Sequence, residues 1–173
     1  MANQTLHFIV DADVARSAGL SEHPVSSGSR YLLESISKKG HKAAMCPKLL
    51  QEWKQHKSLF SKRWLASMIA KKKIAFINPN AKIKIFIEEN VSEGKDKDIA
   101  LKDSHLIDAA LETDKIITSN DSTAKAVFCT LSKKNGEISQ ISWFNAVTDK
   151  DFISDTLMSN GQIPSKYFLQ SES

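Results

Sequence analysis

The sequence predicts an α/β fold in which helices cover both faces of a central, mainly parallel sheet, giving a three-layer α/β/α sandwich. Short apolar runs of strand length recur along the chain, and amphipathic segments of helix length separate them. The first run, LHFIV (Leu6 to Val10), is apolar throughout, which is typical of a strand buried on both faces of a parallel sheet. The 173 residues are 41% hydrophobic and suffice for one core, so we expect a single domain over residues 1–173.

The elements after the first strand can be taken in order. SGSRYLLESISKKG predicts a helix that Ser29 caps and Gly40 ends. HKAAMC is a weak second strand, and Pro47 suits the first position of the helix that follows. Apolar residues at helical spacing then predict a further helix through Phe60, Trp64, Leu65, Met68 and Ile69.

One segment of the second half is ambiguous. In AKIKIFIEEN, Ile83, Ile85 and Ile87 alternate as in a strand, whereas Asn80 suits the cap of a helix. The other segments keep the alternation of strand and helix, and in order they are IAFI, KDSHLIDAALETD, KIITS, DSTAKAVFCTLSKK, ISQISWFNA and DFISDTLMSN. This alternation predicts parallel strands joined by helices that pack on the two faces of the sheet.

The positive charge of the chain is concentrated in one segment. Residues 38–73 hold eleven Lys or Arg and one acid, Glu52, a net charge of +10, whereas the whole chain carries +4 and the remainder therefore −6. Cations at this density are typical of proteins that bind a phosphate backbone. A lysine-rich helical face in solvent is the alternative, and charge alone does not separate the two.

Two observations exclude other classes of protein. No run approaches the roughly 18 apolar residues of a membrane span, and MANQT leads directly into the first strand without a cleavable signal pattern. Cys46 and Cys129 are far apart and lack the paired spacing of a zinc site. We therefore expect a cytoplasmic protein that makes no membrane contact.

An aspartate lies in line with the apolar residues of a predicted helix. At about 100° per residue, Asp103 falls near the middle of a stripe roughly 80° wide, and Asp108 lies about 140° away from it. The members of the stripe are Ile99, Asp103, Leu106, Ile107 and Ala110. An isolated inward carboxylate costs several kcal/mol unless it is protonated, paired with a cation or bound to a metal. Asp103 is therefore expected to point inward toward a compensating group, and Asp108 outward or sideways.

Three other acids are placed where they can meet Asp103. Asp11 follows the first strand directly, and Asp121 comes two residues after KIITS. Glu52 lies on the helix after the second strand. Ligands of open α/β sheets bind beyond the carboxyl ends of parallel strands, so these side chains are expected at one edge. Four acids there would raise one another's pKa, and a hard divalent cation with oxygen ligands, Mg²⁺ or Mn²⁺, removes that conflict.

Each acid also has an ordinary structural explanation. Asp11 can end a strand, and Asp121 can cap the helix that follows it. Asp103 can pair with a lysine, and Glu52 can pair with the cation one turn before or after it on its own helix. We favour a shared site because the structural explanations require four coincidences.

The order of these motifs resembles that of PIN domains. FIVDAD, the Glu in CPKLLQEW, and KDSHLIDAALETDKIITSND carry the resemblance, which extends from the first strand to ISWFN. Its most specific part is Asp-x-x-Leu-Ile-x-x-Ala-Leu followed by a strand and Ser-Asn-Asp. The resemblance implies a PIN-like sandwich in which AKIKIFIEEN is helical.

The same resemblance implies a metal-dependent nuclease that acts on RNA. The positions of the family's acidic quartet are Asp11, Glu52, Asp103 and Asp121. Ser119 falls where the family often has a Thr or Ser that helps arrange the metal site. Many bacterial members are toxins that a small partner protein holds inactive. We therefore expect an endoribonuclease dependent on Mg²⁺ or Mn²⁺, with single-stranded RNA, a small inhibitory protein and a second copy of the chain as candidate partners.

The chemistry of phosphodiester hydrolysis suggests how the acids would divide the work. Asp11, Asp103 and Asp121 are the predicted ligands of one or two ions, which would activate a water and stabilise the leaving oxygen. Glu52 would either be a further ligand or orient the water. Asp13 lies two residues beyond the strand end and is a weaker candidate, because it can simply cap the following turn.

Basic and aromatic residues surround the acid of the third helix in the sequence. Lys48, Lys54 and Lys57 would guide a phosphate backbone toward the acids. Trp53 and Trp64 could stack on bases, but tryptophan at helical spacing beside leucines is more often part of a core. We therefore assign both tryptophans to the core.

Two other functions compete with the nuclease. FIVDADV fits the Asp-x-Asp-x-Val start of haloacid dehalogenase-like phosphatases, with Asp11 as nucleophile and Asp13 as general acid. Those enzymes need further acids after a later strand, whereas ISQISWFNA is followed by no acid before Asp149. The other competitor is a non-enzymatic RNA-binding or scaffold module, against which the presence of all four acids argues.

Overall fold

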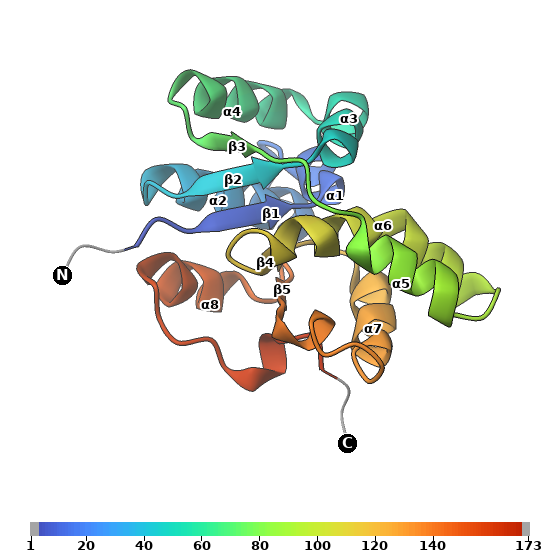
Figure 1. The fold of residues 1–173 in the computed structure, drawn as a ribbon. Coiled ribbons are helices and arrows are strands. Elements are labelled where there is room, and N and C mark those ends of the chain that lie inside the picture. The colour runs from blue at the N-terminus through green and yellow to red at the C-terminus, as the bar shows by residue number, and fades with distance from the viewer. Residues whose placement is uncertain (1–3, 171–173) are drawn as a thin grey trace.

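Five parallel strands form the centre of the molecule (Figure 1). The structure is a computed structural model that describes residues 4–170. The strands are β1 (His7–Val10), β2 (Lys42–Met45), β3 (Ile74–Phe76), β4 (Ile116–Thr118) and β5 (Ser142–Phe144). They pair in the order β3-β2-β1-β4-β5, and each of the four pairings is parallel. The predicted α/β class and parallel sheet are confirmed.

Helices cover both faces of this sheet, as the apolar strands require. The helices are α1 (Ala12–Ser17), α2 (Pro24–Lys38), α3 (Pro47–His56), α4 (Leu59–Ala70), α5 (Lys82–Asn90), α6 (Lys95–Leu111), α7 (Ser122–Leu131) and α8 (Lys150–Asp155). On one side α2 contacts β2, α4 and α8, and on the other α6 contacts β1, β4, α5 and α7. Phe8 and Ile9, which point to opposite faces of the central strand, are both fully buried. The three-layer sandwich is therefore confirmed.

The chain leaves the neighbouring strands β1 and β4 toward opposite faces of the sheet. After β1 the chain passes to α1 and α2 in one helical layer, whereas after β4 it passes to α7 in the other. Strands β1 and β4 are neighbours, with Ile9 opposite Ile117 and Val10 opposite Thr118. Their carboxyl ends thus flank a topological switch point, where the loops diverge and leave room for a ligand. Helix α3 contacts both α1 and α6 and so lies across this edge.

The two tryptophans with predicted core positions are buried. Trp53 of α3 is fully buried and its Nε1 donates a hydrogen bond of 2.9 Å to the carbonyl of Val10. Trp64 of α4 donates from Nε1 to the carbonyl of Leu33 at 2.7 Å. Because each indole N–H has a partner inside the core, the prediction that both rings are structural is confirmed.

Several element boundaries differ from the prediction. Helix α2 begins at Pro24, and Ser29 is a buried residue inside it instead of its cap. Proline is already set to helical φ, so it starts the helix earlier than the serine pattern indicates. The ambiguous segment AKIKIFIEEN contains α5, with Ile83 and Ile87 buried one turn apart. The strand predicted in ISQISWFNA is confined to β5, because Ile138–Gln140 forms a 3₁₀ turn.

Two further differences concern short helices. Ala12–Ser17 forms α1 directly after β1, where no helix was predicted. The last predicted helix, DFISDTLMSN, is divided into α8 and a 3₁₀ turn at Leu157–Ser159. Both pieces are shorter than two full turns, so their apolar residues do not establish a helical period. None of the helices between residues 4 and 170 is both long and apolar enough to cross a lipid bilayer.

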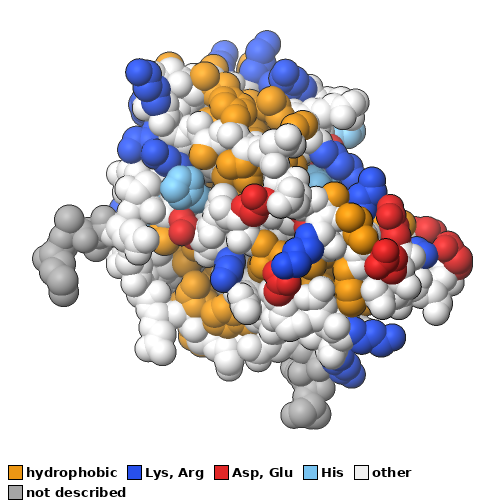
Figure 2. Space-filling model, viewed as in Figure 1, with side chains coloured by type: hydrophobic (Ala, Val, Ile, Leu, Met, Phe, Trp, Pro, Cys, Tyr) orange, Lys and Arg blue, Asp and Glu red, His pale blue; other side chains and the backbone are white. Residues whose placement is uncertain are grey.

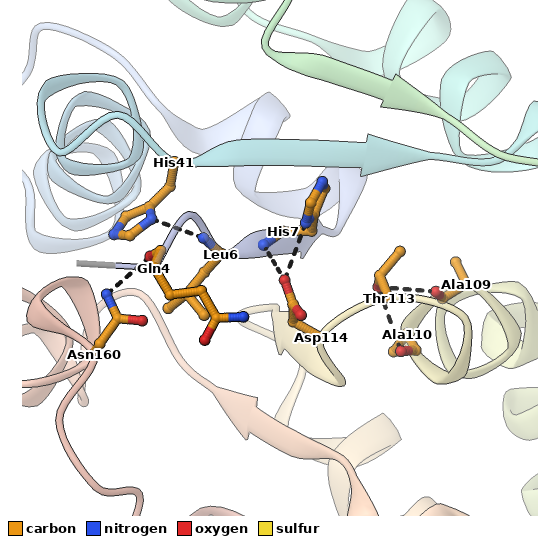
Figure 3. Close-up of polar contacts among 9 residues, drawn as sticks. All are labelled: Gln4, Leu6, His7, His41, Ala109, Ala110, Thr113, Asp114 and Asn160. Carbon is orange, nitrogen blue, oxygen red and sulfur yellow. Dashed lines mark hydrogen bonds and ion pairs between the residues drawn. The ribbon is translucent and has the colours of Figure 1, made fainter. Parts of the chain in front are cut away.

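Polar contacts between distant segments close the amino end of the sheet (Figure 3). His41 is buried, its Nδ1 accepts a hydrogen bond from the Leu6 amide at 3.0 Å, and its Nε2 donates to the Met158 carbonyl at 2.8 Å. Asp114 Oδ2 accepts from the backbone amide of His7 at 2.6 Å and lies 3.0 Å from the same residue's Nδ1. These contacts tie the first strand to the turn before β4 and to the C-terminal segment.

Candidate active site

A cleft of about 440 Å³ opens at the carboxyl ends of β1 and β4. Five acidic residues line it: Asp11, Asp13, Glu52, Asp103 and Asp121. Its other charged or amide side chains are Arg16, His56, Lys102 and Asn120. The four acids predicted to lie together, which come from four different parts of the chain, therefore line one cavity.

Asp11 lies at the base of the cleft because it directly follows β1. Its amide donates to the Thr118 carbonyl at 2.9 Å, which continues the pairing of β1 with β4 by one residue. Its Oδ2 accepts a hydrogen bond of 2.8 Å from Ser119 Oγ, and Ser119 is itself held by a backbone bond to Phe144. Ser119 does not line the cleft, but it fixes the orientation of Asp11. Asp11 therefore does more than end a strand.

Asp103 is buried in the cleft wall without a partner. The side chain is 5% exposed, and among residues 4–170 it makes no hydrogen bond or ion pair. Burial, followed by the nearby charge of Asp11, raises the pKa of Asp103 to about 6. The charges of His105 and Lys102 act in the opposite direction, but no lysine among residues 4–170 forms an ion pair with Asp103.

Asp121 occupies the cap position of α7. Its Oδ1 accepts a hydrogen bond from the amide of Ala124 at 2.9 Å, so the structural explanation for this residue is correct as far as it goes. The residue also lines the cleft. A carboxylate has about four acceptor sites, and capping uses one of them. Capping and ligand binding are therefore compatible for Asp121.

Glu52 contacts His105, a residue that was not among the site residues predicted from the sequence. Its Oε1 lies 2.5 Å from Nε2 of His105 on α6, although the two groups are not aligned as a hydrogen bond. Burial acts to raise the pKa of Glu52, but contact with His105 and the charges of Lys48 and Lys102 outweigh it and lower the pKa. The ion pair of Glu52 is therefore with His105 of another helix, and the structural alternative of a pair with Lys48 or His56 on its own helix is not observed as an ion pair.

His105 is unusual because it is buried without a complete set of partners. The residue is 8% exposed, and its Nδ1 has no hydrogen-bond partner among residues 4–170. On α6, every residue from Asp103 to Ala110 is buried, since α3, α5 and α7 all pack against this helix. Asp108, predicted outward or sideways, is buried sideways, where its Oδ1 accepts from the Ile83 amide at the start of α5.

Asp13 belongs to the cleft more firmly than its sequence position suggested. Its Oδ2 accepts a hydrogen bond of 3.1 Å from the Asn120 amide and lies 3.4 Å from Ser119 Oγ. Burial, and then the charge of Asp11, raises the pKa of Asp13 to about 7. Asp11 itself has a raised pKa, again mainly because it is buried. The cleft thus concentrates carboxylates that are costly to keep ionised together.

The predicted phosphate-binding lysines do not line this cleft. Lys48 donates from Nζ to the backbone carbonyl of Lys102, and Lys57 donates to the carbonyl of Lys54. The basic side chains that do line the cleft are Arg16 on α1, His56 on α3 and Lys102 on α6. Arg16 could have been found only by recognising the short helix α1, which turns it toward the acids.

The donor set fits a hard divalent cation that keeps some of its waters. All five acids of the cleft supply oxygen, and the buried Asp103 lacks any compensating partner. Among residues 4–170, however, no three His, Cys, Asp or Glu side chains converge tightly enough to form a ready-made metal centre. Mutual repulsion between the carboxylates favours this separation, and small side-chain rotations or bridging waters would be needed for shared coordination. Comparison of the chain with protein-family models and with curated proteins gave no match.

Proposed function

We propose that the protein is a nuclease that depends on Mg²⁺ or Mn²⁺ and hydrolyses RNA phosphodiester bonds. The observation that carries the proposal is Asp103, a buried and unpartnered carboxylate that faces the same cleft as Asp11 and Asp121. A buried charge with no protein partner is expected to have a ligand, and a divalent cation is the ligand that carboxylate oxygens suit best. The resemblance of the motif order to PIN domains supports RNA as the substrate.

The residues of the cleft would divide the work by position. Asp11, Asp103 and Asp121 would hold the cation, and Ser119 would keep Asp11 oriented through its 2.8 Å hydrogen bond. The bound cation would supply an activated water and a positive charge against the scissile phosphate. Glu52, held in place by His105, would accept a proton from or orient the attacking water.

Basic side chains of the cleft would bind the substrate. Arg16, His56 and Lys102 line the same cleft as the acids and would contact phosphates of a bound substrate. Arginine suits this task because its planar guanidinium can donate two parallel hydrogen bonds to a phosphate. We assign direct phosphate contact to these residues, because Lys48, Lys54 and Lys57 do not line the cleft.

A phosphatase is the second candidate because of Asp13. Its pKa of about 7 is that of a carboxyl able to donate a proton near neutral pH. Against this function, Asp149, the first acid after β5, accepts a hydrogen bond from the Asn145 amide and does not line the cleft. Hydrolysis of a phosphate monoester that is lost in Asp13→Asn, with RNA left intact, would favour the phosphatase over the nuclease.

A toxin role for this nuclease follows from the family resemblance alone. A small inhibitory protein and a homodimer are the partners that such a role predicts. Purification of the chain together with the product of a neighbouring gene, followed by measurement of RNA cleavage with and without it, would test the inhibitory partner.

The nuclease proposal is tested with labelled single-stranded RNA and Mn²⁺. Asp11→Asn should lower the cleavage rate by roughly a hundredfold or more, equivalent to about 3 kcal/mol of transition-state stabilisation. The matched control is Asp151→Asn, which changes an exposed acid on α8 and should cleave at the wild-type rate. If RNAs of several sequences all remain intact with each of several divalent ions, the nuclease proposal fails and a non-enzymatic binding module remains.

A further inference from the structure

Two lysine-rich turns lie side by side at the amino end of β2 and β3. The turn before β2 follows α2, and the turn before β3 follows α4. Ala43 of β2 pairs with Ile74 of β3, and the Ala43 amide donates to the Lys73 carbonyl at 3.1 Å. Lys73 Nζ also lies 3.4 Å from the Gly40 carbonyl of the neighbouring turn. The parallel pairing of the two strands therefore brings the two turns together.

These turns carry six lysines, which we call the amino-edge lysine cluster. Its members are Lys38, Lys39, Lys42, Lys71, Lys72 and Lys73. Lys38, Lys39, Lys71 and Lys72 are exposed, and among residues 4–170 none of the six forms an ion pair with a carboxylate. Figure 2 shows Lys and Arg side chains gathered at the upper left of the molecule, over the ends of α4 and β2. The cluster is therefore a concentrated and uncompensated positive surface.

This surface is separate from the cleft. The cluster lies where β2 and β3 begin, whereas Asp11 and Ser119 lie where β1 and β4 end. At roughly 3.3 Å per residue, the strands alone place about 10 Å between the two edges, and the turns add to that separation. One phosphate group cannot contact both, so a ligand of the cluster is either a second molecule or a chain long enough to reach the cleft.

We propose that the amino-edge lysine cluster binds the phosphate backbone of single-stranded RNA at a distance from the cleft. Repeated phosphates match closely spaced lysines that form no ion pair with a carboxylate. The edge strand β3 begins at the cluster and ends in Phe76, whose side chain is 58% exposed. The exposed ring, about three residues along the strand from the cluster, offers a base of a bound RNA chain a stacking platform.

The proposal deepens the proposed function, and its identification of RNA rests on that function. It implies a substrate that extends beyond the cleft, running along the β3 edge from the lysine cluster past Phe76. Longer RNA should therefore bind more tightly than short RNA, because only longer chains engage both surfaces. Cleavage of a fragment too short to reach the cluster should not depend on these lysines.

Two charge-reversal doublets test the cluster. Lys71→Glu/Lys72→Glu changes the turn after α4, and Lys133→Glu/Lys134→Glu is the matched control, since it changes two adjacent exposed lysines directly after α7. Each doublet removes the same charge. Anisotropy of a labelled RNA of about 30 nucleotides, measured in EDTA so that no cleavage occurs, should show about tenfold weaker binding for the first doublet and under threefold for the second. Equal losses would overturn the proposal.

A second variant and a second ligand complete the test. Lys38→Glu/Lys39→Glu, on the neighbouring turn, should reproduce the loss of affinity, so misfolding of one doublet would not decide the outcome. Loss of binding to phosphatidylserine vesicles with RNA affinity unchanged would overturn the proposal in favour of a membrane ligand. Unchanged binding to both ligands would also overturn it.

Cleavage measurements separate this proposal from the nuclease itself. With Mn²⁺, an RNA of about four nucleotides should be cleaved equally by wild type and by Lys71→Glu/Lys72→Glu, because it cannot span both surfaces. An equal loss on short and long RNA would contradict a separate surface. If no RNA is cleaved but the doublet still weakens binding selectively, the nuclease proposal fails and the lysine surface stands.

Discussion

The two ends of the sheet satisfy their polar groups in opposite ways. At the amino end, His41, His7 and Asp114 each have a protein partner, and Asn160 donates to the Gln4 carbonyl (Figure 3). At the carboxyl end, in contrast, Asp103 is buried with no hydrogen-bond partner among the described residues, and burial raises the pKa of several neighbouring acids. The polar side chains named at the amino end thus all have protein partners, whereas Asp103 at the carboxyl end has none among residues 4–170.

The presence or absence of partners for buried polar groups distinguishes residues that stabilise the fold from residues that serve a function. A buried polar group with partners can contribute about 1 kcal/mol net, whereas one without them costs about 1–3 kcal/mol. An arrangement that destabilises the isolated protein is expected to persist where a ligand compensates for it. We therefore expect substitutions of the partnered residues at the amino end to destabilise the fold, and substitution of Asp103 at the carboxyl end to stabilise the metal-free protein while removing activity.

The largest expected effect on stability is at His41. Its two ring nitrogens contact one donor and one acceptor, which fixes the tautomer with hydrogen on Nε2. His41→Ala would leave the Leu6 amide and the Met158 carbonyl unpaired beside a cavity, so we expect a loss of about 3 kcal/mol in the free energy of unfolding. Urea denaturation measures this loss. His23→Ala, at an exposed histidine, should change stability by under about 0.5 kcal/mol.

Substitution of Asp103 is expected to increase the free energy of unfolding when EDTA keeps the protein free of metal. Its pKa of about 6 in the folded protein exceeds the ordinary 3.8, so the folded state binds the proton more tightly than the unfolded state. Ionisation therefore destabilises the fold above about pH 6, and stability rises as the pH falls from 7 toward 4. Asp103→Asn should stabilise the metal-free protein by about 2 kcal/mol at pH 8 and by little near pH 4.

A control on the same helix tests the cause of that effect. Asp96 is exposed in the first turn of α6, where its charge is favourable to the helix dipole. Asp96→Asn should therefore not stabilise the protein at any pH. A stability difference between Asp103→Asn and wild type that is independent of pH between 4 and 8 would contradict the raised pKa of Asp103.

His105 is expected to act through Glu52. Leucine at position 105 would fill the buried site without contacting the carboxylate, whereas the glutamine amide could still donate to it. We expect His105→Leu to lower kcat for RNA cleavage about tenfold at similar KM, and His105→Gln to retain most of the activity. Single-turnover and steady-state kinetics measure both quantities. Equal losses in the two variants would mean that His105 serves only packing.

The smallest expected effect compares two cations near the cleft. Arg16 lines the cleft, whereas Lys54 is exposed on α3 and does not. Arg16→Ala should raise KM for a short RNA by about threefold to tenfold, and Lys54→Ala should change it by less than about twofold. The reverse order would restore the assignment made from the sequence.

The architecture was largely predictable because burial leaves a simple pattern. Apolar runs such as Phe8 to Val10 marked strands covered on both faces, and the alternation with helices fixed the layers. The predictions that were wrong concern short elements and element boundaries that local sequence determines. Helix α1 has six residues, too few to show a period, and the start of α2 depends on Pro24 more than on a serine cap.

The position of the acids was predictable for a related reason. Asp11 and Asp121 follow strands that end at the same edge, so the topology alone brings them to one cleft. His105 could not be found in this way, because the helical-wheel argument assumed that α6 is buried on one face only. In the structure α6 is surrounded in its second half, and contact between His105 and Glu52 depends on how α3 crosses it.

The most direct test of the central claim is the effect of Mn²⁺ on thermal stability. If the acids of the cleft share a cation, saturating Mn²⁺ should raise the Tm of wild type by several degrees and that of Asp103→Asn by much less. Asp114→Asn, at the amino end, should have a lower Tm but keep the full Mn²⁺-induced rise. Equal rises in wild type and Asp103→Asn would contradict the account.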